Sequence, residues 1–175
     1  MNIQRVECSS VIQNVMKCVT FSLLIGVGAQ VSIPCLPVPF TLQTMCVFWV
    51  VSQLGKKWGT LAIIMYLFEG LMGLPVFANL LCGPSVILGP RGGYLLGFIP
   101  AAYIIGTSLD YSKSWKSIIV GIVLAEIALF LCGYFQLALF TGSVGAYYAG
   151  VKPFLISEAI KIIASVLCIK KAIKA

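Results

Sequence analysis

The sequence predicts an all-α integral membrane protein with six transmembrane helices and both termini in the cytoplasm. Of its 175 residues, 60% are hydrophobic and only 10% are charged, whereas about a quarter of the residues in a soluble domain carry charge. Apolar stretches recur along the whole chain, and most are close to the length of about 20 residues that a helix needs to cross a bilayer. The basic residues also divide unequally between the two sides of this layout, as the positive-inside rule requires.

The six spans can be placed in order along one membrane domain that covers residues 1–175. They are predicted at residues 15–32, 40–55, 58–73, 92–108, 115–139 and 153–170. The second and third spans are short and are joined by Gly55-Lys56-Lys57, so we expect them to form a tight helical hairpin. Residues 1–14 are expected to form a cytoplasmic or interfacial segment, because they lack the apolar core and cleavage site of a signal peptide.

Charge placement supports this orientation. With both termini on one side, only Arg91 and Lys152 fall on the opposite side, and Lys161 lies within a span. The remaining nine basic residues share the side of the termini: Arg5, Lys17, Lys56, Lys57, Lys113, Lys116, Lys170, Lys171 and Lys174. That side is therefore predicted to be cytoplasmic. The net charge of +7 reflects this topology, and we expect no nucleic-acid partner.

The two outward connections at 33–44 and 73–93 are unusual. The first carries three prolines, Pro34, Pro37 and Pro39, and the second is rich in glycine and proline, yet both remain apolar. Apolar, irregular backbone near a membrane is tolerated where it is buried in protein or lines a cavity. We interpret these loops as a lid over an outward-facing pocket, with ordinary turns between helices as the alternative.

Missing residue types exclude several enzyme classes. The chain has no histidine and one aspartate, Asp110, which argues against an imidazole base, a histidine metal site and a magnesium-dependent lipid phosphotransferase. The segment Gly55-Lys56-Lys57 lacks the other residues of a phosphate-binding loop. We therefore predict no catalytic residues, no metal and no cofactor, and any ATP hydrolysis must come from a partner.

Glu158 and Lys161 form the first candidate site. They lie one helical turn apart inside the last apolar span, where side chains at i and i+3 share a face. Ionisable groups at membrane depth are costly and usually serve a site. A structural ion pair between helices is the alternative.

Four motifs and their order resemble one known family. They read AQVSIP (29–34), PVPFTLQT (37–44), GLPVFA (73–78) and LGPRGGYLLGF (88–98). They resemble the BioY family, the biotin-binding S components of energy-coupling factor (ECF) transporters. The resemblance implies an ECF S-component-like bundle of six helices that captures biotin, with uptake energised by a membrane coupling protein and ATPase subunits. A final motif of this family usually reads PFLPGDLIK, whereas here it reads PFLISEAIK, so Glu158 stands in place of an aspartate.

A biotin ligand also accounts for the candidate side chains. A ureido ring offers two N–H donors and one carbonyl acceptor, so it suits a carboxylate beside a cation or an amide. The predicted binding residues are Glu158, Lys161 and Asn79 at the ureido ring, Arg91 or Lys152 at the anionic valerate, Gln43 from the first outward motif, and Phe40, Phe77, Tyr94 and Trp49 around the apolar rings. Asn79 as a turn residue and Arg91 as an interfacial anchor remain alternatives.

A docking face for the coupling protein is predicted on the first span. Ser22 and Gly26 are spaced i, i+4 and Ala29 follows, which makes a stripe of small residues that lets another helix approach closely. The alternative is that these small residues let the first span pack against a neighbouring helix of the same chain.

Together these features predict a multi-pass subunit of the cell membrane that binds biotin for uptake and is not an enzyme. An S component for another small vitamin is one alternative. A membrane enzyme or scaffold, which belongs to a different functional class, is the other.

Overall fold

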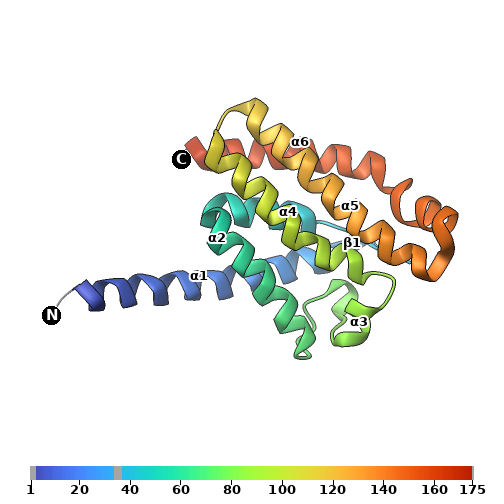
Figure 1. Ribbon diagram of the computed structural model, residues 1–175, viewed down its shortest axis with the longest axis horizontal. Helices are drawn as coiled ribbons and strands as arrows, with labels where there is room; N and C mark the ends of the chain where they lie inside the picture. Colours follow the sequence, from blue (N-terminus) through green and yellow to red (C-terminus); the bar gives the residue numbers. More distant parts are fainter. Residues whose placement is uncertain (1–2, 34–36, 175) are drawn as a thin grey trace.

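The computed structural model describes residues 3–33 and 37–174, so Pro34, Cys35 and Leu36 of the predicted proline-rich loop lie outside the described residues. The fold is a bundle of long helices (Figure 1). In chain order the elements are α1 (Ile3–Gln30), β1 (Ser32–Ile33), β2 (Phe40–Thr41), α2 (Gln43–Leu71), the 3₁₀ turn η1 (Ala78–Leu80), α3 (Pro84–Leu88), α4 (Gly92–Tyr111), α5 (Trp115–Ala146), the π turn η2 (Tyr147–Val151) and α6 (Phe154–Lys174).

The first helix begins earlier than the predicted span. α1 is helical from Ile3, whereas the apolar stretch was predicted to start at residue 15. In Figure 1 its N-terminal turns extend beyond the other helices. The predicted interfacial segment is therefore a continuation of the first helix.

The second element is a hairpin of two helices. Gly55 interrupts α2 with φ +75° and ψ 176°, a conformation that residues with a side chain avoid. The two halves then pack so closely that a Cβ atom on Gly59 would lie 2.8 Å from the Cα atom of Val51. The hairpin predicted around Gly55-Lys56-Lys57 is confirmed, and the two halves correspond to the second and third predicted spans.

Close packing of α4 on α5 forms the centre of the bundle. A Cβ atom on Gly97 would lie 3.1 Å from the Cα atom of Leu129, which is tighter than most such contacts, so the glycine favours this close approach. Near the connection between the two helices, Ser108 donates to the backbone oxygen of Ser117 at 2.6 Å, and Ser117 donates to that of Ser108 at 2.8 Å. These paired bonds fix the register of the two helices.

The predicted cytoplasmic connections meet at one end of the bundle. Lys56, at the hairpin turn of α2, pairs with Asp110 near the end of α4 at 3.6 Å. Lys170, near the end of α6, donates to the backbone oxygen of Lys113 at 2.6 Å. Three of the nine basic residues that the sequence assigned to one side, Lys56, Lys113 and Lys170, thus lie at one end of the structure.

The two outward loops form a joint structure at the other end. β1 and β2 pair as antiparallel strands, with Ser32 opposite Thr41. Gln30, at the end of α1, donates to the backbone oxygen of Phe77 and accepts from the amide of Leu80, both at 3.0 Å. The loops are therefore joined to each other through α1. This arrangement favours the lid over ordinary turns, because ordinary turns would not need such links.

Three helical stretches in the described part of the chain are long and apolar enough to cross a membrane. They are Val11–Gln30, Gly92–Tyr111 and Trp115–Val151. Large apolar side chains remain exposed along these helices, for example Val27, Tyr103 and Phe135. Such a surface is suited to lipid. The two halves of α2 are shorter, and α6 carries several charges. These segments are therefore not among the stretches that are long and apolar enough to cross a membrane.

Candidate binding site

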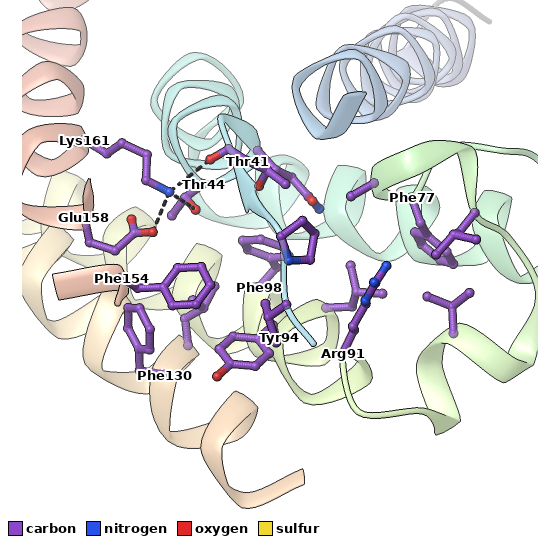
Figure 2. A pocket seen from close by; sticks show the side chains of 18 residues that line it. Thr41, Thr44, Phe77, Arg91, Tyr94, Phe98, Phe130, Phe154, Glu158 and Lys161 are labelled. Carbon is purple, nitrogen blue, oxygen red and sulfur yellow. Dashed lines mark hydrogen bonds and ion pairs between the residues drawn. The ribbon is translucent and has the colours of Figure 1, made fainter. Parts of the chain in front are cut away.

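A pocket opens between the outward loops, the N-terminal parts of α2, α4 and α6, and the middle of α5 (Figure 2). The cavity volume is about 70 Å³, several times the volume that a single water needs. The 18 lining residues come from both loops and from the five helices α2 to α6: Val38, Pro39, Thr41, Gln43, Thr44, Phe77, Ala78, Leu81, Val86, Arg91, Tyr94, Leu95, Phe98, Leu129, Phe130, Phe154, Glu158 and Lys161.

One side of the pocket is polar and is organised around Lys161. Its Nζ atom lies 2.5 Å from Glu158 Oε1, donates to the backbone oxygen of Thr41 at 3.0 Å and reaches Thr44 Oγ1 at 3.4 Å. Only 6% of Glu158 is exposed, so the ion pair is held away from bulk water. Burial makes this pair sensitive to the loss of either partner.

Two further polar atoms of lining residues are buried without a hydrogen-bond partner among the described residues. They are Oε2 of Glu158, an acceptor, and Nε2 of Gln43, a donor. Buried polar atoms are usually hydrogen-bonded. A ligand with both donors and an acceptor would satisfy them.

Arg91 forms a second polar point, at the other side of the pocket in Figure 2. Its Nε atom donates to the backbone oxygen of Pro37 at 2.7 Å, which ties the second loop to the first. Its Nη1 atom is buried and has no partner among the described residues. Because a guanidinium binds carboxylates well, this free donor suits an anionic group.

Aromatic rings fill the space between the polar sides (Figure 2). Phe130 and Phe154 lie with ring centroids 6.2 Å apart, and Tyr94 meets Phe130 at 6.1 Å. The Tyr94 hydroxyl donates to the backbone oxygen of Gly150 at 2.8 Å, so the residue presents its ring, rather than a free hydroxyl, to the pocket. The middle of the pocket is accordingly apolar.

The structure brings six of the eight principal predicted binding residues to this pocket: Gln43, Phe77, Arg91, Tyr94, Glu158 and Lys161. Phe40 lies behind the lining and stacks on Phe154 with centroids 4.3 Å apart. Asn79 is exposed, has φ +63° and accepts from the Ser32 hydroxyl at 3.2 Å. Asn79 is therefore a turn residue of the loop and is outside the pocket.

Two weaker predictions also lie elsewhere. Trp49 packs against Phe21 of α1 with centroids 5.7 Å apart, away from the pocket lining. Lys152 is exposed, with its Nζ atom 4.9 Å from the ring centroid of Tyr148. Arg91 is thus the basic residue that lines the pocket on the side away from Lys161.

The predicted docking face on α1 requires correction. Ser22 is fully buried, and its hydroxyl donates to Glu69 Oε1 in α2 at 2.6 Å. A Cβ atom on Gly26 would lie 3.2 Å from the Cβ atom of Val76. The small residues let α1 pack against its own chain, so they do not form a surface open to a partner.

Some lining residues were not singled out from the sequence. Thr41, Thr44 and Phe98 lie inside the motifs quoted above, and Phe154 follows Pro153 in the last of them. Their position in the motifs could have indicated them. Phe130 lies in an apolar run of α5, where no pattern distinguishes a lining residue from a packing residue.

Comparison with known proteins shows a family and a fold. The BioY family model matches residues 2–175. The biotin transporter BioY of Thermotoga maritima is 40% identical over 156 residues, which cover 89% of this chain and 92% of that protein. The probable biotin transporter BioY of Pyrococcus horikoshii is 36% identical over 147 residues, which cover 84% of this chain and 88% of that protein.

The fold also matches a solved structure. The crystal structure of the S-component for biotin from an ECF-type ABC transporter superposes with a TM-score of 0.81 at 23% identity, covering all of this chain and 95% of that one. At this identity the similarity establishes the fold.

Proposed function

The chain belongs to the BioY family, and on that premise we propose that it is a membrane subunit that binds biotin and mediates its uptake. The resemblance found in the sequence motifs is confirmed by the family match over residues 2–175. The relatives are named as transporters and not as enzymes, in agreement with the sequence prediction.

The observation that carries this proposal is the set of unpartnered polar atoms in one apolar pocket. Glu158 Oε2, Gln43 Nε2 and Arg91 Nη1 are buried without partners among the described residues, and all three residues line the same pocket. Biotin has polar groups at both ends, a ureido ring and a carboxylate, with an apolar bicycle and chain between them. Its donors and acceptors complement these atoms.

The ureido ring fits the side of Lys161 and Glu158. Glu158 Oε2 accepts a ureido N–H, and Gln43 Nε2 or the Lys161 ammonium donates to the ureido carbonyl. A charged acceptor gives a stronger hydrogen bond than a neutral one. The Glu158–Lys161 contact at 2.5 Å holds the carboxylate in place before the ligand arrives, which limits the entropy lost on binding.

The valerate carboxylate fits Arg91. Nε of Arg91 is already held by the backbone of Pro37, so the guanidinium is oriented and Nη1 remains available. The aromatic rings of Tyr94, Phe98 and Phe130 contact the apolar part of the ligand between the two ends.

The same proposal includes the topology and the partners. Six spans with cytoplasmic termini in the cell membrane are supported by the gathering of Lys56, Lys113 and Lys170 at one end of the bundle and by the positive-inside rule. The pocket then opens outward. The sequence has no phosphate-binding loop, so ATP hydrolysis that energises uptake would come from the ATPase and coupling subunits that the similarity to an ECF S-component implies.

Binding to the purified subunit tests the function. Labelled biotin should bind the subunit alone, and unlabelled biotin should compete while riboflavin, thiamine and pantothenate do not. Competition by one of these vitamins in place of biotin would favour the second candidate, an S component for another vitamin. This candidate is tested because position 158 holds a glutamate where the family usually has the shorter aspartate, and the longer side chain changes the geometry of the pocket.

A further inference from the structure

Glu126 is a buried carboxyl group that the proposed binding mode does not use. It lies in the middle of α5, is 5% exposed, and is not a lining residue of the binding pocket. Neither of its oxygens has a donor partner among the described residues. An intramembrane carboxyl group without a partner is costly enough to require an explanation.

The carboxyl group of Glu126 lies against the binding site from behind. It lines one groove together with Glu158 of α6, and it lies close enough to Glu158 and Lys161 for both to act on it electrostatically. From α4, the Tyr94 hydroxyl is already used by the backbone oxygen of Gly150. The titratable groups that face Glu126 across the helix interface are therefore one carboxyl group and one ammonium.

The surroundings of this cluster are apolar. Glu126 and Glu158 both line a groove between α5 and α6, where Tyr134 is the one further residue with a polar group and the others are Val123, Ile127, Phe130, Leu131, Val151, Leu155, Ala159 and Ile162. Several of these side chains are exposed on the outer surface of the bundle, which faces lipid in the proposed topology. A net charge in this groove would be strongly unfavourable.

Counting charges decides the protonation of the cluster. Lys161 balances one carboxylate, and Glu158 is the carboxylate in contact with it at 2.5 Å. If Glu126 were also ionised, one buried negative charge would remain unpaired. Two ionised carboxylates in one apolar groove would also repel each other, which favours the protonated form of one of them.

We propose that Glu126 is a positioning residue that holds a proton and donates a hydrogen bond to Oε2 of Glu158. This inference rests on the proposed function, since it assigns to Glu126 the task of orienting the carboxylate that binds the ligand. Glu158 lines both the binding pocket and the rear groove. Each carboxylate oxygen can accept two hydrogen bonds, so Oε2 accepts from Glu126 on one side and from the ligand on the other.

Two substitutions separate the donor role from simple packing. Glu126→Gln keeps a donor at the same position and should bind biotin within about twofold of the unmodified subunit, whereas Glu126→Leu should bind about tenfold more weakly, the effect of one hydrogen bond. Glu69→Leu is the matched control, because it removes another intramembrane carboxyl group outside the pocket lining, and its biotin affinity should be unchanged. Thermal unfolding without biotin establishes that each variant is folded.

The proton itself has two separate readouts. The infrared band of a protonated carboxylic acid should be present in the unmodified protein and lost in Glu126→Gln. Biotin affinity should also fall as the pH rises in the unmodified protein, because the donor is lost, and fall less in Glu126→Gln. Every other ionisable group is shared by the two proteins, so the difference between them reports on Glu126.

The outcomes distinguish this inference from the proposed function. If Glu126→Leu binds biotin as well as the unmodified subunit, or if Glu126→Gln and Glu126→Leu weaken binding equally, the positioning role is wrong and biotin binding stands. If the unmodified subunit does not bind biotin, the proposed function fails together with the positioning role. The infrared band still decides in that case whether Glu126 holds a proton.

Discussion

Lys161 in α6 donates from its Nζ atom to the backbone oxygen of Thr41 at 3.0 Å, across 120 positions of the sequence. Thr41 belongs to β2, at the end of the first outward loop. The same ammonium contacts Glu158. A ligand that engages Glu158 or Lys161 therefore acts on the group that holds the loop in place, so binding and loop position are linked through one side chain.

The ion pair should contribute to stability mainly through the cost of breaking it. Lys161→Met leaves the buried carboxylate of Glu158 uncompensated, and such losses are on the order of 3 to 5 kcal/mol. The double change Glu158→Gln with Lys161→Met removes both charges and should unfold at a higher temperature than Lys161→Met alone. Thermal unfolding of the purified variants without biotin measures this difference, and additive destabilisation by the two changes would contradict it.

Glu158→Gln should weaken biotin binding by roughly tenfold to a hundredfold, because the charged acceptor of the ureido ring becomes neutral and a hydrogen bond to a charged group contributes about 1.5 to 3 kcal/mol. Titration of the purified subunit with labelled biotin measures the change.

Glu69→Gln is the control for this substitution. Glu69 accepts from Ser22 at 2.6 Å, outside the pocket lining, and a glutamine oxygen can accept the same bond. Its biotin affinity should therefore be unchanged. Equal affinities for both variants would make the Glu158–Lys161 pair purely structural.

Arg91→Ala should separate the two ends of the ligand. If Nη1 meets the valerate carboxylate, this variant loses affinity for biotin by about tenfold or more but binds a neutral biotin amide about as well as the unmodified subunit does. Competition titrations with both ligands provide the comparison.

Arg91 also donates to the backbone oxygen of Pro37. Its alternative role is therefore to position the first loop without contacting the ligand carboxylate. A weakening of the same size for biotin and for its amide would assign Arg91 to loop placement alone. Arg91→Lys keeps the positive charge but loses the planar fork of donors, so it should recover part of the affinity for biotin in the first case.

The fold was predictable because its strongest signals are local. Apolar stretches bounded by Gly55-Lys56-Lys57 and by the breakers of residues 73–93 determine where helices end, and the hairpin at Gly55 follows from them. The helical start of α1 at Ile3 was missed because polar residues in the first turns indicate only that a segment is not buried in lipid.

The site was predictable where chemistry restricts the choice of residue. Glu158 and Lys161 stand out because charges within an apolar span are costly. Asn79 was misplaced because a polar residue beside a motif can serve either a ligand or a turn, and its φ of +63° depends on the folded loop. The partner proposed for Glu126 could not be inferred from the sequence, since no spacing along the chain shows which residue of α6 lies next to α5.

The small residues of α1 provide the last prediction, which reverses the role that the sequence suggested for them. Gly26→Leu should lower the stability of the isolated subunit by about 1 to 3 kcal/mol through overpacking, because even a Cβ atom would lie 3.2 Å from that of Val76. Val27→Leu is the matched control: its side chain is 61% exposed, and the change should alter stability by less than about 0.5 kcal/mol.

Thermal unfolding and co-purification with the coupling protein distinguish the two roles of this stripe. A buried stripe predicts that Gly26→Leu loses stability and ligand binding together, even when no partner is present. If the variant instead unfolds at the same temperature as Val27→Leu and binds biotin, yet no longer co-purifies with a coupling subunit, Gly26 would face the partner after all. Such a result would require α1 to leave Val76 when the complex assembles, because the space beside Gly26 is occupied in the isolated subunit.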